Sequence, residues 1–206
     1  MLITTEPGRE YFINEIIENL GLKFIPGVLV TPNQDFSPTL ISSRITRFSL
    51  DLSHYFRMLA GRVVTMPTAV GLDFELGNEF EVIPITTTLS RGTWNEVETS
   101  NFIYDPIVFN RSAGEVQRII PTSFALTRMI DGKEQRIVVV GDSDCLSNTE
   151  LTGSRAGIEA GNIHYIKAIF NWLSNGVLPV DVRRESPPDN KIYLSMSQMK
   201  KWKVAL

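Results

Sequence analysis

Residues 136–148, RIVVVGDSDCLSN, hold several side chains that could do chemistry within a few positions. A continuous β-branched run ends at a glycine, and a hydroxyl, two carboxylates and the thiol of Cys145 follow. Open α/β sheets bind ligands just past the carboxyl ends of such buried strands. The first candidate ligand-binding residues are therefore Gly141, Asp142, Ser143 and Asp144.

Two nucleophiles are conceivable in this loop. Ser143 lies in a pattern close to the G-x-S-x-G nucleophile elbow, but Cys145 replaces the second glycine, whose lack of a side chain the sharp turn needs. Its base would have to be His54 or His164, the two histidines of the chain. Cys145 itself is flanked by Asp144, and a neighbouring carboxylate disfavours the reactive thiolate. A hydrolase or amidotransferase-like enzyme is kept as an alternative, and no catalytic residue is assigned.

The two aspartates could also hold a divalent cation, because carboxylate oxygens are hard ligands. Asp142 and Asp144 are two positions apart, and the sequence assigns no third acidic partner. One aspartate capping the next helix, with the other in solvent, is the simpler interpretation. We therefore predict neither a metal nor a cofactor.

A second polar segment follows another strand-like run at residues 80–86. Its hydroxyls, guanidinium and indole could bind a small molecule or a glycan, and this segment would lie near the first loop if both strands were parallel. A small-molecule or sugar sensor is thus a further alternative. The candidate binding residues here are Thr87, Thr88, Arg91 and Trp94.

The elements that must position these residues alternate along the chain. Apolar spacing predicts helices over 11–20 and 163–173, with Asn162 placed to cap the second. Strand-like runs surround them, and Asp131-Gly132 between two such runs predicts a hairpin. This alternation favours an α/β fold: a three-layer flavodoxin-like sandwich with a mostly parallel sheet, plus an antiparallel hairpin and a C-terminal tail.

Composition limits the function classes. The net charge of -3 and the lack of clustered Lys and Arg in the body of the chain argue against a nucleic-acid partner.

We divide the chain into an α/β domain, 1–178, and a linker and tail, 179–206. The tail ends in KKWKVAL, in which tryptophan and lysines suit a membrane–water boundary. The chain therefore looks like a piece of a longer protein with flanking membrane segments.

The ordered features resemble a known family, the GldG-like auxiliary components of ABC transporters associated with gliding motility. The similar segments are LITTEP at 2–7, NEIIENLGLKFIPGVLV at 14–30, PITTTLSRGTW at 84–94, the GDSD loop, the helix at 162–173 and the stretch 192–206. The resemblance implies a class I glutamine-amidotransferase-like domain, periplasmic or otherwise extracytoplasmic, in a protein anchored in the inner membrane. It also implies a role in binding ligand or protein, not in catalysis, with the transporter's ATPase and permease subunits as partners.

Overall fold

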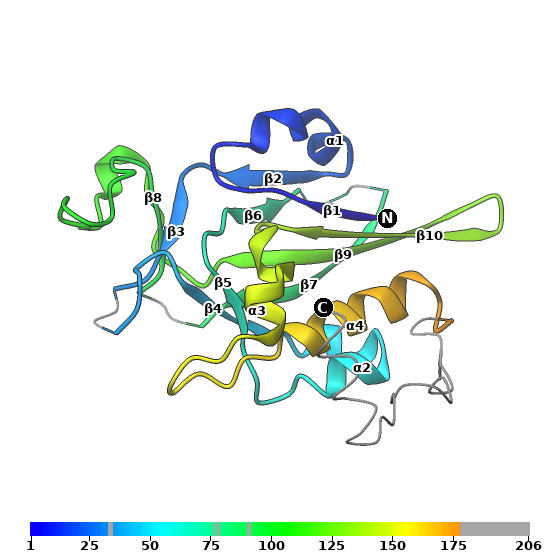
Figure 1. Cartoon of the computed structure of the whole chain (residues 1–206). Coiled ribbons are helices and arrows are strands. Elements are labelled where there is room, and N and C mark those ends of the chain that lie inside the picture. Colours follow the sequence, from blue (N-terminus) through cyan, green and yellow to red (C-terminus); the bar gives the residue numbers. More distant parts are fainter. Residues whose placement is uncertain (33–34, 76, 78, 90–91, 178–206) are drawn as a thin grey trace, which may run out of the picture.

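A curled, mixed sheet of six strands forms the centre of the protein (Figure 1). The computed structural model describes residues 1–32, 35–75, 77, 79–89 and 92–177. The sheet has the order β1-β10-β9-β7-β4-β5. Only β1 and β10 run parallel, and the other four neighbouring pairs are antiparallel.

Two further pairs of strands, β2 with β6 and β3 with β8, form small separate sheets. The strands are β1 (Leu2–Thr4), β2 (Leu22–Ile25), β3 (Val28–Val30), β4 (Ile41–Ile45), β5 (Val64–Met66), β6 (Gly71–Phe74), β7 (Glu81–Thr88), β8 (Trp94–Glu96), β9 (Pro121–Ile130) and β10 (Lys133–Val140). The α-helices are α1 (Asn14–Asn19), α2 (His54–Arg57), α3 (Asn148–Thr152) and α4 (Asn162–Leu173). Short 3-10 turns lie at η1 (Glu10–Phe12), η2 (Phe48–Asp51), η3 (Arg111–Ala113) and η4 (Asp144–Leu146).

The predicted three-layer, flavodoxin-like or glutamine-amidotransferase-like sandwich is therefore wrong: the fold is mostly β, with few helices. The β-branched run of β10 suggested a parallel sheet because it is buried on both faces. Val138 and Val140 enter one core under α2 and α4, while Ile137 and Val139 enter a second core with α1, β2 and β6. An antiparallel strand covered on both sides gives the same sequence pattern.

The hairpin signal is confirmed. β9 and β10 pair from Ile130↔Lys133 onward, and the turn residues Asp131 and Gly132 both have positive φ angles, 49° and 74°. That backbone matches the right-handed twist of the two strands. The ladder between β7 and β9 shifts register after Pro84, which has no backbone N–H to donate, although β7 lies inside the sheet.

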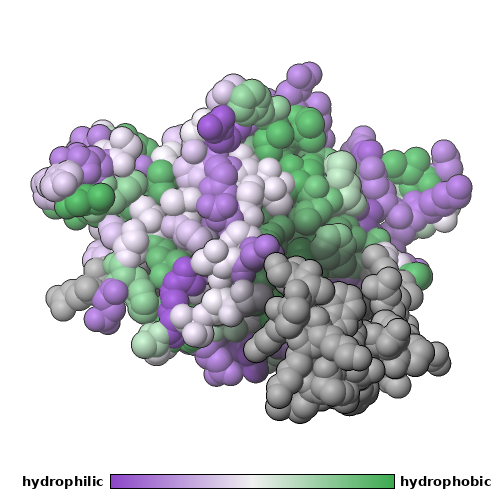
Figure 2. Space-filling model, in the orientation of Figure 1, coloured by the Kyte–Doolittle hydropathy of each residue, from purple (hydrophilic) through white to green (hydrophobic). Residues whose placement is uncertain are grey.

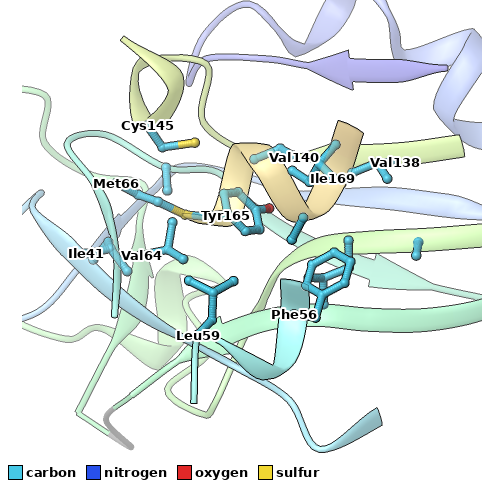
Figure 3. Packing of buried hydrophobic residues seen from close by; sticks show 14 of the residues in the cluster. Ile41, Phe56, Leu59, Val64, Met66, Val138, Val140, Cys145, Tyr165 and Ile169 are labelled. Carbon is cyan, nitrogen blue, oxygen red and sulfur yellow. The ribbon is translucent and has the colours of Figure 1, made fainter. Parts of the chain in front are cut away.

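The larger core lies between the sheet and α4 (Figure 3). Tyr165 of α4 is fully buried there, beside Met66 and Ile169. Its hydroxyl faces those of Thr86 and Ser123 but meets neither with hydrogen-bond geometry, and burial raises the pKa of this phenol. This buried face is filled by side chains and therefore serves packing.

Asn162 does not cap α4. Gly161 occupies the N-cap position, and the Asn162 side chain is buried. Its amide donates to Thr65 O and to Cys145 O, both at 2.8 Å, so it ties β5 and η4 to the start of the helix. An asparagine before an apolar helical pattern looks the same in sequence whether it caps the helix or joins the core.

A long connection between β8 and β9, residues 97–119, projects from the body at the left of Figure 1 and is called the arm below. Three buried polar side chains hold its base. Glu96 accepts hydrogen bonds from Glu98 N and Thr99 N, at 2.9 and 3.1 Å. Glu115 accepts from Val97 N and Asn110 N, and Asn95 accepts from Val116 N. The arm is therefore a loop whose base is held by buried polar side chains.

Candidate functional site

The two polar segments identified in the sequence do end at one edge of the sheet. β9 lies between β10 and β7 and is antiparallel to both, so these two strands run in the same direction. Gly141 N donates to Thr122 O at 2.9 Å, and Thr88 N donates to Ile120 O at 2.9 Å, on either side of the start of β9. The expected proximity therefore arises through an intervening antiparallel strand.

Glycine is required at the end of β10 by a close approach of two chain segments. A Cβ on Gly141 would collide with Val70 O, whose residue also donates its N–H to Gly141 O at 2.8 Å. Asp142 then turns inward and has no exposed surface. Its carboxylate accepts from Cys145 N at 2.8 Å and from Thr68 N at 3.3 Å. Burial, above all, raises the pKa of Asp142 to about 8.

Glu6, just after β1, occupies the other donors of this loop. Its Oε1 accepts from Ser143 N at 2.7 Å and from Asp144 N at 3.0 Å. Its Oε2 accepts from the Thr68 hydroxyl at 2.9 Å. Two successive backbone N–H groups that face one carboxylate oxygen form an anion-binding concavity. The protein's own Glu6 fills it. We call Glu6, Thr68, Asp142, Ser143 and Asp144 the loop cluster.

The two candidate nucleophiles are both engaged internally. The Ser143 hydroxyl lies 2.9 Å from Thr4 Oγ1 and 3.2 Å from Thr5 O, and its single proton goes to one of them. Cys145 is fully buried, and its thiol lies 3.1 Å from Asp142 O. Burial, followed by the charge of Asp142, raises the pKa of this thiol well above its ordinary value. Among the described contacts, neither His54 nor His164 hydrogen-bonds to these groups.

Asp142 and Asp144 face opposite ways, the first into the core and the second into solvent. The described residues contain no group of three His, Cys, Asp or Glu side chains able to hold a metal ion. Asp142 accepts from Cys145 N at the turn η4 that follows it, while the next helix, α3, is capped by Ser147, whose hydroxyl accepts from Glu150 N.

The second polar segment is also used within the fold. The Thr88 hydroxyl is buried and accepts from Ile120 N at 3.0 Å. Trp94 is buried, its indole donates to Glu96 at 3.3 Å, and its ring packs edge-on against Phe109. Thr87 is half-buried, and Arg91 lies outside the described residues. Binding of a ligand by any of the sequence-derived candidates stays a prediction.

A groove with none of those candidates in its wall lies beside α1. It has a volume of about 730 Å³. One wall comes from η1 and α1, the other from β2, β3 and the turn between them, and Ser100 of the arm closes it on one side. Its apolar lining includes Tyr11, Ile17, Phe24, Pro26 and Val28.

The groove has an acidic character. Glu10 and Glu18 line it, and Lys23 is the basic residue in the lining. Lys23 forms an ion pair with Glu75, so its charge is compensated. The groove thus combines an apolar floor with the carboxylates of Glu10 and Glu18, and the ion pair of Lys23 is formed with Glu75.

Apolar side chains are also exposed on the arm, where Figure 2 shows green atoms on the part that projects at the left. Ile103 and Tyr104 are 82% and 83% exposed, and Val108 is 68% exposed. The hydrogen bonds at the base of the arm keep these side chains in solvent instead of letting them collapse onto the body. The arm and the groove adjoin at Ser100.

Reasoning from sequence missed Glu6 and the groove. Glu6 was not found because its partners at 143 and 144 are more than 130 positions away. A usable signal for the groove was present. Tyr11, Phe12, Ile13, Ile16, Ile17 and Leu20 cover more of a helix than one face, so some had to be exposed. Tyr11 and Phe12 are both 64% exposed.

Comparisons with known proteins support the fold alone. No protein-family model and no curated protein matches this chain. Its structure is similar to a solved structure described as the mmIFT52 N-terminal domain, with a TM-score of 0.54 and 13% sequence identity. The similarity covers 84% of this chain, which spans 64% of the length of that one.

The expected membership of the GldG-like family is therefore wrong. The structural neighbour is a mostly β domain of an intraflagellar-transport protein, not an ABC-transporter accessory or an amidotransferase-like domain. No support exists for the transport, gliding-motility or amidotransferase terms that followed from that resemblance. The extracytoplasmic location stays a prediction. In the described ranges, no helix is both long and apolar enough to cross a membrane.

Proposed function

We propose that this domain is a non-catalytic, protein-binding module whose binding surface is the groove beside α1 together with the arm. The observation that carries the proposal is the exposure of Ile103 and Tyr104 on a loop whose base is fixed by buried polar side chains. Contiguous exposed apolar surface on a soluble domain marks an interaction site. A fixed loop also loses little conformational entropy on binding.

The partner class follows from the shape and lining of the groove. Aromatic and aliphatic side chains form its floor, and carboxylates of Glu10 and Glu18 lie in its wall. A polypeptide segment that places apolar side chains on the floor and Lys or Arg near the carboxylates matches both features. The occupant that we propose is therefore an apolar, basic peptide segment.

The alternative of a hydrolase or amidotransferase-like enzyme has less support. A serine nucleophile needs a base within hydrogen-bond reach, whereas the Ser143 hydroxyl faces Thr4 and Thr5. A cysteine nucleophile needs an accessible thiolate, whereas Cys145 is fully buried and its thiol pKa is raised. The anion-binding concavity of the loop is also filled by the Glu6 carboxylate, so it does not offer its N–H groups to a substrate oxygen, which further weakens the support for an enzyme.

A displayed library of random peptides, panned on the immobilised full chain, tests the proposal. We expect enriched peptides to combine apolar residues with Lys or Arg and to bind about tenfold more weakly to Tyr11→Asp, because the charge enters the apolar floor. Met129→Asp is the matched control, since Met129 is as exposed as Tyr11, 64% for each, but lies near the tip of the β9–β10 hairpin. Ser143→Ala should bind like the unaltered chain.

Two results would refute the proposal. One is panning that enriches no peptide over a bare surface. The other is an equal loss of affinity in Tyr11→Asp and Met129→Asp, which would mean that the peptides recognise general exposed surface and not the groove.

A further inference from the structure

The C-terminal segment of this chain has the properties that the groove selects for. Residues 190–206 contain Lys191, Lys200, Lys201 and Lys203 and no Asp or Glu, although the whole chain carries a net charge of -3. Within the last residues, lysines at 201 and 203 alternate with Trp202, Val204 and Leu206. An extended chain with this alternation has one basic and one apolar side.

We propose that residues 200–206 bind intramolecularly in the groove beside α1, with the apolar side on the groove floor and the lysines near its carboxylates. This inference rests on the proposed function, since it names the first occupant of the same groove. Trp202 supplies the large, rigid anchor that such grooves bind best. The floor offers Tyr11, Phe24 and Pro26 to that anchor.

Charge complementarity favours the lysine-bearing segment over other parts of the chain. Glu10 and Glu18 line the groove, and the charge of Lys23 is already paired with Glu75. Two lysines brought next to the two carboxylates would therefore gain attraction without displacing an existing ion pair. Ionic strength would weaken this attraction, because the groups are at the surface.

The backbone of the groove can also receive an extended segment. In the described part of the chain, β2 pairs with β6 alone, and no strand pairs with its other edge. Lys23 and Phe24 of β2 line the groove, which places this strand at its wall. A peptide added along a free strand edge gains main-chain hydrogen bonds, and its alternate side chains supply the specificity.

The chain is long enough to reach the groove from the end of the described fold. The stretch between Val177 and residue 200 spans roughly 70 Å when extended. A domain of this size has a radius of gyration of about 16 Å, so the stretch can pass around the body with slack. Tethering also raises the effective concentration of the segment near the groove to about the millimolar range.

The test uses the full chain with two introduced cysteines, Ser100→Cys in the groove wall and Ala205→Cys in the tail. In a glutathione redox buffer, we expect the intramolecular disulfide to form with an effective concentration at least about tenfold above that of the control pair. The control is Ser154→Cys with Ala205→Cys, because Ser154 is also exposed but does not line the groove. Cys145 is buried, so we expect it to form no disulfide in either variant.

Two further variants separate specific docking from chance contact. Lys201→Glu with Lys203→Glu should reduce the preference for Ser100 to that of the control, and added salt should reduce it in part. Asn14→Cys, on the helix side of the groove, is a second reporter if Ser100→Cys disturbs the arm. The same preference should appear there.

Equal effective concentrations for Ser100 and Ser154 would overturn the inference. A disulfide that joins two chains would overturn the intramolecular form and indicate a second copy as the occupant. Sedimentation of the chain with anionic phospholipid vesicles, lost in the lysine variant and accompanied by no preference for Ser100, would assign the tail to a membrane surface instead.

Failure of this inference and failure of the proposed function remain distinguishable. If library peptides bind the groove but the Ser100 pair shows no preference, the groove is a protein-binding site for a partner other than the tail. If the inference holds, Lys201→Glu with Lys203→Glu should bind library peptides more tightly than the unaltered chain, because the competing segment is removed.

Discussion

Removal of the Glu6 carboxylate tests the central feature of the loop cluster. Glu6→Ala deletes an acceptor that receives hydrogen bonds from Ser143 N, Asp144 N and Thr68 Oγ1, at 2.7, 3.0 and 2.9 Å. These contacts join the start of the chain, the segment after β5 and the loop after β10. Without Glu6, the end of β1 keeps the contact of Thr4 and Thr5 with the Ser143 hydroxyl but loses the carboxylate that joins it to this loop and to Thr68.

The expected destabilisation is about 2–4 kcal/mol. A hydrogen bond to a charged acceptor contributes about 1.5–3 kcal/mol net, and three such bonds would exceed this range if they were additive. Two effects lower the total. Asp144 is exposed, so water can replace the carboxylate at its N–H. The negative charge of Glu6 also helps to raise the pKa of buried Asp142, and its removal relieves that repulsion.

Chemical denaturation of the full chain, monitored by circular dichroism, measures this change in the free energy of unfolding. In thermal unfolding, the same loss should lower the midpoint by about 4–16 °C, at about 2–4 °C per kcal/mol for a domain of this size. Glu6→Gln should lie between Ala and the unaltered chain, because its amide oxygen can accept from both N–H groups but carries no negative charge. Glu15→Ala, on the exposed side of α1, is the control and should change stability by less than about 0.5 kcal/mol.

A Glu6→Ala variant that is within about 0.5 kcal/mol of the unaltered chain would refute this reasoning. It would mean that water satisfies the loop N–H groups as well as the carboxylate does. A large loss in Glu15→Ala would instead show that any change near α1 destabilises the domain.

Three further outcomes follow from the buried ionisable groups. The folded-state pKa of Asp142, about 8, lies above its unfolded value, so the free energy of unfolding should fall as pH rises from about 4 to 8, by up to about 1.4 kcal/mol per pH unit. Urea titrations should show a smaller fall for Asp142→Asn. The same pH dependence in both proteins would contradict this expectation. The Cys145 thiol should react with a disulfide reagent roughly 100-fold more slowly than a free thiol until the protein unfolds, and rapid native labelling would disprove its burial. Arg155→Ala should lower the free energy of unfolding by about 2–3 kcal/mol, because it leaves the buried Glu150 carboxylate without its ion-pair partner. Arg62→Ala breaks a more exposed ion pair, with Glu159, and should lower it by less than about 1 kcal/mol. Equal losses would contradict this difference between the two ion pairs.

Local features of this fold could be read from local patterns. The β9–β10 hairpin follows from Asp131-Gly132, since both residues adopt positive φ angles that a tight hairpin needs. The apolar spacing of residues 163–173 predicted α4, and Gly21, with a φ of 71°, follows the C-cap of α1. In each of these cases the residues that decide the structure are within a few positions of one another.

The sheet topology could not be obtained in this way. The β-branched run of β10 shows that a strand is covered on both faces, but not what covers it. The two cores could come from flanking helices of a parallel sheet or, as here, from α2 and α4 on one side and α1 with β2 and β6 on the other.

The sequence by itself determined which side chains could act and where the chain turns. It singled out Gly141 to Asp144 and the polar residues at the end of β7, and it located both at strand ends. Only the tertiary structure decided what these groups do. It brings Glu6 from the start of the chain to Ser143 and Asp144, buries Asp142 and Cys145, and leaves the groove and the arm exposed. The physical reason is that hydrogen-bond partners and burial depend on contacts between residues far apart in the chain, which no local pattern records.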